Sequence, residues 1–308
     1  MPDTMNPWPS LAPYGKSVSM SGGTLFYYDS AGNDDSAQDD DPLTNRQTIL
    51  LIHGLGDEAD TWRHIFPLLV QAGYRVLALD LPGFGRSLWQ GLISMRQHCR
   101  AVLRVMAEAA ASTERPVALV GSSLGAGIAE MVAGRQPDLV QSLVLIDGCF
   151  PFAGSMDRAL LLVGLPFVGK NWYRSFRTNH EAAWKSLYPY YRDLDALSVE
   201  DKDFLRQRVI ARVESSNQER GYFATLRSMA AVFQFGKRAL TRKIQTYSGK
   251  ILVLWGEGDT VLPQGKADLF RSLRPDADFA IIANAGHLPH QEQPDATAAE
   301  ILRFYKEK

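Results

Sequence analysis

The 308-residue sequence predicts an α/β fold: a mostly parallel central sheet, covered by helices on both faces, with an inserted helical cap. Three observations lead to this prediction. Short, continuous apolar runs alternate with segments of helical periodicity, which is typical of buried parallel strands joined by helices. The alternation stops near residue 150 and resumes near residue 246. The composition, 45% hydrophobic and 22% charged, is that of a chain able to bury a sizeable core.

The first half of the sheet can be assigned run by run. Residues 18–29 alternate around Gly22-Gly23 and predict a strand pair. The acidic, proline-terminated stretch 33–42 predicts a solvated loop. The strands that follow are predicted at 48–52, 75–79, 117–120 and 143–146, with helices at 58–71, 94–112 and 124–135.

Residues 150–245 predict the cap, because aromatic and charged residues recur there at helical spacing without a clear buried strand. The apolar stretch 158–168 is expected to pack on the core, with lining of an acyl pocket, or contact with a membrane, as the alternatives. Aromatic residues between 172 and 191 are expected either to hold the cap together or to shape a pocket. The core is then formed by residues 1–149 and 246–308, with strands predicted at 251–255 and 279–282 and helices at 263–273 and 295–306.

Charge and cysteine content exclude several classes of function. The net charge of −1 gives no field that would attract nucleic acid or an anionic membrane. The two cysteines, Cys99 and Cys149, indicate neither a disulfide framework nor a zinc site, and Cys149 is expected to be a small buried apolar residue. Without a signal-peptide pattern or a membrane-length apolar run, we expect a cytoplasmic protein with no stable membrane insertion, either a monomer or a homodimer.

The segment Gly121-Ser122-Ser123-Leu124-Gly125 directly follows the apolar run 117–120. A buried strand that ends in Gly-x-Ser-x-Gly and passes at once into a helix predicts a nucleophile elbow, with a strained serine above the sheet. Bulkier side chains at Gly121 and Gly125 would collide with the neighbouring strand and helix. Ser123 is therefore the candidate nucleophile.

A serine hydroxyl needs a positioned base with a pKa near neutrality, and histidine is the natural choice. His287 follows the last predicted strand and lies on the loop at its carboxyl end, where open α/β sheets assemble their sites. His290 is the nearest alternative. We therefore expect His287 to be the base.

The base in turn needs a carboxylate that fixes its tautomer and stabilises its charged form. Asp259 follows the 251–255 strand and lies at the same sheet edge as Ser123 and His287. The chain order serine, aspartate, histidine is the order that this architecture uses. Asp147, after the 143–146 strand, and Glu257 are the alternatives.

Two backbone N–H groups should stabilise the negative charge of a tetrahedral intermediate. Leu124 begins the helix after Ser123 and offers one N–H. The other is expected from Leu55, with Gly54 as the alternative, because His53-Gly54-Leu55-Gly56 turns sharply after the 48–52 strand. His53 itself is expected to be structural.

Together these segments resemble the successive signatures of the α/β-hydrolase superfamily. They are His53-Gly54-Leu55-Gly56, Asp80-Leu81-Pro82-Gly83-Phe84-Gly85-Arg86-Ser87, Gly121–Gly125, Trp255–Asp259 and Gly286-His287. The resemblance runs from about residue 18 to the C-terminus and is weakest in the cap. It implies a turn at 80–87 and a substrate pocket bordered by Gly54, Phe84 and Leu288.

Within that family the nucleophile separates the activities. Ser123 argues against haloalkane dehalogenases and epoxide hydrolases, which carry aspartate at this position. Leu288-Pro289-His290 after His287 looks more like the esterase and lactonase branches than the meta-cleavage carbon–carbon hydrolases, which usually have tryptophan there. The resemblance therefore implies a cofactor-free and metal-free serine esterase, or lactonase, acting on an apolar or aromatic acyl substrate. The alternatives are carbon–carbon bond hydrolysis, thioester cleavage and, more remotely, a hydrolase-fold ligand receptor.

Overall fold

The computed structural model describes residues 5–32, 46–111, 113–148 and 168–306. The acidic stretch 33–42, Cys149 and residues 158–167 of the apolar cap stretch lie outside the described residues. The interpretations made for them from the sequence stay predictions.

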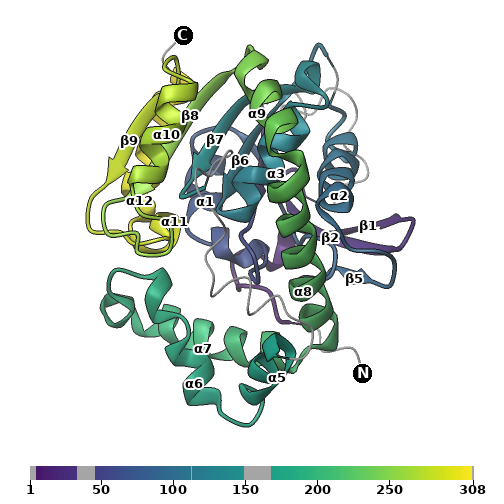
Figure 1. Cartoon of the computed structure of the whole chain (residues 1–308), viewed down its shortest axis with the longest axis vertical. Coiled ribbons are helices and arrows are strands. Elements are labelled where there is room, and N and C mark those ends of the chain that lie inside the picture. The colour runs from purple at the N-terminus through teal and green to yellow at the C-terminus, as the bar shows by residue number, and fades with distance from the viewer. Residues whose placement is uncertain (1–4, 33–45, 112, 149–167, 307–308) are drawn as a thin grey trace.

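A nine-stranded sheet forms the centre of the molecule (Figure 1). Its strands run in the order β1-β2-β4-β3-β6-β7-β8-β9, with β5 paired to β2. Neighbouring strands are parallel along the path β4-β3-β6-β7-β8-β9. Strand β2 is antiparallel to each of its partners, β1, β4 and β5. The strands are β1 (Gly15–Met20), β2 (Gly23–Asp29), β3 (Thr48–Ile52), β4 (Arg75–Leu79), β5 (Leu88–Trp89), β6 (Val117–Ser122), β7 (Val140–Ile146), β8 (Lys250–Gly256) and β9 (Asp278–Ile282). The predicted mostly parallel α/β sheet is confirmed.

Helices cover both faces of the sheet, which is why the central strands are apolar without alternation. Every residue of β3, β4 and β6 is buried. One hydrophobic cluster joins the sheet to α2 (Met95–Glu108), α3 (Leu124–Ala133), α9 (Lys237–Thr246) and α10 (Gly265–Leu273). A second cluster joins it to α1 (Ile65–Gln71) and α12 (Pro294–Lys306). The helices outside the cap are α1 (Ile65–Gln71), α2 (Met95–Glu108), α3 (Leu124–Ala133), α10 (Gly265–Leu273), α11 (Pro289–Glu292) and α12 (Pro294–Lys306), with the 3-10 turns η1 (Ala12–Tyr14), η2 (Ala59–Trp62) and η3 (Pro137–Leu139).

In the described part of the segment between β7 and β8, helices are joined by short turns. Figure 1 shows α5, α6 and α7 grouped below the sheet, away from the helices on its faces. The elements are α5 (Val168–Ser175), α6 (His180–Lys185), η4 (Tyr188–Tyr190), η5 (Leu194–Ala196), α7 (Val199–Glu214), α8 (Ser216–Ala231), the π-helical turn η6 (Val232–Gly236) and α9 (Lys237–Thr246). Ser198 and Ser215 cap α7 and α8 by accepting the N–H of Asp201 and Gln218.

Two details differ from the sequence prediction. The helix predicted over 58–71 is divided into η2 and α1, because Asp60, Thr61 and Arg63 turn inward to partners elsewhere in the fold. The two-residue strand β5 gave no detectable pattern, since one of its residues is exposed and the other buried.

Candidate active site

The parallel register brings several loops to one edge of the sheet. Ile52 of β3 pairs with Gly121 of β6, Gly121 with Leu145 of β7, and Leu145 with Val253 of β8. These strands therefore end at the same level. The residues that follow them form a common surface at the carboxyl edge, as expected for an open α/β sheet.

Ser123 occupies the sharp turn between β6 and α3. Its backbone has φ 52° and ψ −114°, a conformation that L-residues rarely adopt. The Ser123 N–H donates to the carbonyl of Ile146 at 2.8 Å, which ties the turn to the end of β7. The residue is only partly buried. The strained turn thus holds the serine at the sheet edge, as a nucleophile elbow requires.

The glycines on either side of Ser123 are needed for space. A Cβ on Gly121 would overlap the backbone of Gly125, and a Cβ on Gly125 would overlap the carbonyl oxygen of Ile52. Neither obstacle is a flexible side chain. The close approach of β3, β6 and α3 therefore depends on glycine at both positions.

The Gly125→Ala variant is expected to lose about 3 kcal/mol of unfolding free energy, because α3 must move away from β3. Denaturant unfolding monitored by circular dichroism would measure this loss. Gly265→Ala is the matched control, since a Cβ there meets nothing within 4 Å, and its stability should be unchanged or slightly higher. Equal stability of the two variants would contradict the close approach.

His287 and Asp259 form a buried hydrogen-bonded pair. The Nδ1–H of His287 donates to Asp259 Oδ2 at 2.8 Å, and both side chains are almost fully shielded from solvent. Asp259 Oδ1 accepts the backbone N–H groups of Val261 at 2.8 Å and Leu262 at 2.9 Å. This arrangement fixes the tautomer that leaves Nε2 of His287 free to act as a base.

The alternatives for these two roles have other partners. His290 is buried against Trp62, its Nε2 hydrogen-bonds with the Thr61 hydroxyl at 2.9 Å, and burial lowers its pKa to about 3. Glu257 is exposed and pairs with Arg192 at 2.5 Å. Asp147 is fully buried at the end of β7, and one of its oxygens accepts the Gly256 N–H at 2.8 Å. The residue hydrogen-bonded to the His287 ring is therefore Asp259.

The segments that carry the candidate oxyanion donors lie beside the serine. Leu124 is the first residue of α3, so its N–H has no acceptor within the helix. The β3 loop passes close by, since a Cβ on Gly54 would lie 3.5 Å from Ser123 Cβ. Buried His53 bridges this loop to the next one: its Nδ1 hydrogen-bonds to the Gly54 carbonyl at 2.7 Å, and its Nε2 accepts the Leu81 N–H at 2.9 Å. Its contacts are those of the structural residue expected from the sequence.

Among the residues expected to border the pocket, Phe84 is fully buried in the core, with its ring 5.6 Å from that of His53. Leu288 is partly buried and packs on a cluster that contains Trp184 and Tyr191 of the cap. Phe84 therefore supports the loops, whereas Leu288 lies where the cap meets the loop that carries His287.

Two tyrosines of the cap lie against the site. The Tyr190 ring centroid is 5.9 Å from that of His287. The backbone carbonyl of Tyr190 accepts the backbone N–H of His287 at 2.9 Å. The Tyr222 ring lies against Gly56, 3.4 Å from where a Cβ would stand. Tyr222 was missed by the sequence analysis. Its only signal there was an aromatic residue in a helical segment, which cannot show the loop that it covers.

A buried ionic cluster joins cap helix α7 to the loop that follows Leu55. Arg212 pairs with Asp57 and, at 2.6 Å, with Glu58; Arg208 pairs with Glu58 at 3.3 Å and with Asp60 at 2.9 Å. Burial by itself would raise the pKa of Glu58, but the charges of Arg212 and Arg208 outweigh it and lower that pKa to about 2. The cap is thus bound to the candidate oxyanion loop. This cluster was not predicted from the sequence.

Among the described residues, Asp147, Asp259 and His287 are the carboxylate and imidazole groups close enough to contact a common cation, with one oxygen or nitrogen of each lying within 4.8 Å of the others. The hydrogen bond between Asp259 Oδ2 and His287 Nδ1 already joins two of these atoms. Two of the three groups are therefore already paired with each other.

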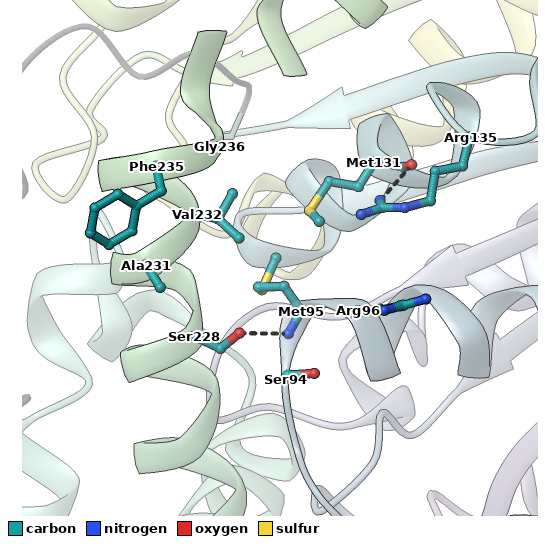
Figure 2. Close-up of a pocket in the computed structure, with 10 residues that line it drawn as sticks. All are labelled: Ser94, Met95, Arg96, Met131, Arg135, Ser228, Ala231, Val232, Phe235 and Gly236. Carbon is teal, nitrogen blue, oxygen red and sulfur yellow. Dashed lines mark hydrogen bonds between the residues drawn. The ribbon is translucent and has the colours of Figure 1, made fainter. Parts of the chain in front are cut away.

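A separate surface pocket of about 360 Å³ lies between α2, α3 and the end of α8 (Figure 2). Its walls include Met95, Met131 and Val232, and the exposed ring of Phe235 stands at one side. Ser123, Asp259 and His287 do not line it. The strand ends therefore locate the candidate active site, and this pocket does not.

Comparisons with known proteins agree with the fold and the motifs. The chain is 25% identical over 294 residues to Lipase 1 of Psychrobacter immobilis, covering 94% of this chain and 83% of the lipase. It is 25% identical over 268 residues to the 2-hydroxy-6-oxononadienedioate/2-hydroxy-6-oxononatrienedioate hydrolase of Escherichia coli, covering 84% of this chain and 86% of that protein. The crystal structure of a putative lipase from Acinetobacter baumannii superposes with a TM-score of 0.71 at 22% identity, over 95% of this chain and 91% of that one.

In the described part of the chain, none of the helices combines the length and the apolar character that crossing a membrane would need.

The model of the Alpha/beta hydrolase family matches residues 49–300, which span β3 to α12 and include every candidate catalytic residue. The resemblance inferred from the motifs is thereby confirmed: the chain belongs to the alpha/beta hydrolase family.

Proposed function

We propose that the protein is a serine hydrolase that cleaves a carboxylic ester or lactone through an acyl-enzyme. Ser123 attacks the acyl carbonyl while His287 Nε2 takes its proton, and the same nitrogen later protonates the leaving alcohol. Asp259 orients His287 and stabilises its charged form. The N–H groups of Leu55 and Leu124 stabilise the oxyanion. Water activated by His287 then releases the acid and restores Ser123.

One observation carries this proposal: the buried Asp259–His287 hydrogen bond at the edge of the sheet that also carries the strained Ser123. A buried imidazole with its Nδ1–H committed to a carboxylate is oriented for proton transfer at Nε2. A serine at φ 52° persists only where the surroundings enforce it. Each feature alone has structural explanations, but the two together are what a serine triad needs.

The substrate class follows from the cap. We assign residues 150–245 to a cap over the site, in which Tyr190 lies beside His287 and Tyr222 against Gly56. Aromatic walls next to the base and the oxyanion loop favour an apolar or aromatic acyl group.

The test is hydrolysis of p-nitrophenyl esters from acetate to palmitate, combined with labelling by a fluorophosphonate and peptide mass analysis. We expect turnover with a defined optimum of chain length, and a single label on Ser123 that abolishes the turnover. Labelling elsewhere with full loss of activity, or ester turnover unaffected by complete labelling of Ser123, would contradict the proposal.

Carbon–carbon bond hydrolysis is the second candidate, favoured by the similarity to the E. coli hydrolase named above. The same three residues could catalyse that reaction. A vinylogous 1,5-diketone acid, an acyl thioester and an aryl ester should be compared at equal enzyme concentration. We expect the aryl ester to give the highest kcat/KM, and a diketone rate well above the ester rate would favour the second candidate.

A further inference from the structure

The second carboxyl group at the site, Asp147, is held rigidly beneath the candidate triad. It follows the last residue of β7, is fully buried, and has a left-handed backbone with φ 44°. Its N–H donates to the Leu254 carbonyl at 3.0 Å. The next residue, Gly148, packs so closely on the Ser123 backbone that a Cβ would overlap it. Asp147 is therefore fixed between the nucleophile turn and β8.

The two oxygens of Asp147 have different surroundings. Oδ1 accepts the Gly256 N–H at 2.8 Å. Oδ2 is buried and has no hydrogen-bond partner among the described residues if the group is ionised. An ionised Asp147 would leave this oxygen without a donor in a site shielded from water, which is costly. If Oδ2 carries a proton, it is instead a hydrogen-bond donor that needs an acceptor.

Asp259 provides that acceptor. One oxygen of Asp147, one of Asp259 and one ring nitrogen of His287 lie within 4.8 Å of one another. Two buried carboxylates at this separation cannot both stay ionised at low cost, so the pair retains one proton. Glu292, which is also acidic, adds to the negative charge that acts on Asp147.

The donors decide which carboxyl keeps the proton. Asp259 accepts three hydrogen bonds, from Val261 N, Leu262 N and His287 Nδ1. Asp147 accepts one, from Gly256 N. Hydrogen bonds to a carboxylate stabilise its charged form, so Asp259 is the anion. Burial, followed by the negative charge of Asp259, raises the pKa of Asp147 well above its usual range.

We infer that Asp147 is a positioning residue of the candidate triad: a neutral carboxylic acid that donates to Asp259 and can replace its charge. The inference rests on the proposed function, since it assigns a role within that triad. In the native protein the Asp147 hydroxyl proton restrains Asp259 against His287. When Asp259 is neutralised, Asp147 releases this proton to solvent, and its carboxylate compensates the imidazolium charge of His287.

The kinetic test compares Asp147→Asn, Asp259→Asn and the double variant in p-nitrophenyl ester hydrolysis. Asparagine tolerates a left-handed backbone and its amide reproduces the neutral acid, so Asp147→Asn should fold and lose less than about tenfold in kcat. The kcat of the double variant should fall on the order of 10⁴-fold, as it does when a triad aspartate is replaced by asparagine. Asp259→Asn alone should stay about a hundredfold more active than the double variant, because a carboxylate at this distance still stabilises the imidazolium. Equal rates for Asp259→Asn and the double variant would overturn the inference.

An infrared measurement tests the protonation directly and needs no turnover. At neutral pH the difference spectrum between wild type and Asp147→Asn should show the carbonyl stretch of a protonated carboxylic acid. The same band should appear when the comparison is made in a Ser123→Ala background. Absence of the band would overturn the inference even if the esterase proposal holds. A protein without esterase activity that shows the band would instead refute the esterase proposal alone.

Discussion

Replacing Ser123 with alanine should abolish ester hydrolysis and leave the fold intact. Without the hydroxyl no acyl-enzyme can form, and by analogy with other serine triads kcat should fall by about 10⁵- to 10⁶-fold. Stability should hardly change, because alanine and serine meet the same strain at φ 52° and the turn is held by the Ser123 N–H and its neighbouring glycines. Steady-state kinetics and thermal unfolding of the same preparation would measure both effects.

The sequence provides a matched control in the adjacent residue. The Ser122 hydroxyl is buried and has no hydrogen-bond partner among the described residues, so Ser122→Ala should change kcat by only a few-fold. A large loss in Ser122→Ala together with substantial activity in Ser123→Ala would move the nucleophile and refute the proposed mechanism. Equal, large losses in stability would show that the turn, and not the chemistry, was damaged.

The sheet and the position of the candidate site residues could be predicted from the sequence because both depend on local patterns. Parallel strands covered on both faces appear as unbroken apolar runs, and residues that follow such runs must lie at one edge. Ser123, Asp259 and His287 each follow a run of this kind. The apolar run before each residue was enough to place that residue at this edge of the sheet.

The choice among nearby residues could not be made in this way. Asp147 and Asp259 follow neighbouring strands, and Glu257 is only two residues from Asp259, so all three satisfied the same rule. Side-chain direction separates them: Asp259 turns to His287, Glu257 turns outward to Arg192, and Asp147 turns inward. The pairing of Arg212 with Glu58 was equally hidden, because 154 residues separate the partners.

Replacing Arg212 with methionine should destabilise the protein strongly. Arg212 is the partner of Asp57 and, together with Arg208, of Glu58, which is fully buried. Without Arg212, Asp57 loses this partner and Glu58 retains Arg208, at 3.3 Å. Removing one member of a buried ion pair costs about 3–5 kcal/mol. The Arg206→Met variant on the same helix is the control. Its exposed pair with Glu181, at 3.9 Å, should contribute less than about 1 kcal/mol. Urea unfolding at neutral pH would measure both.

The pH dependence gives the ionic explanation a signature that lost packing would not share. The pKa of Glu58 is lowered in the folded protein from 4.5 to about 2, so its ionisation contributes stability that is fully present above the unfolded value and is lost as the pH falls through the folded one. The stability difference between wild type and Arg212→Met should therefore be largest at neutral pH and narrow steadily below about 4.5. A difference that stays constant down to the acid limit of folding would mean that Arg212 acts through its aliphatic stem.

Because Asp57 and Glu58 follow the loop that carries Leu55, the charge-dependent result would also predict a lower kcat in Arg212→Met at temperatures where it remains folded.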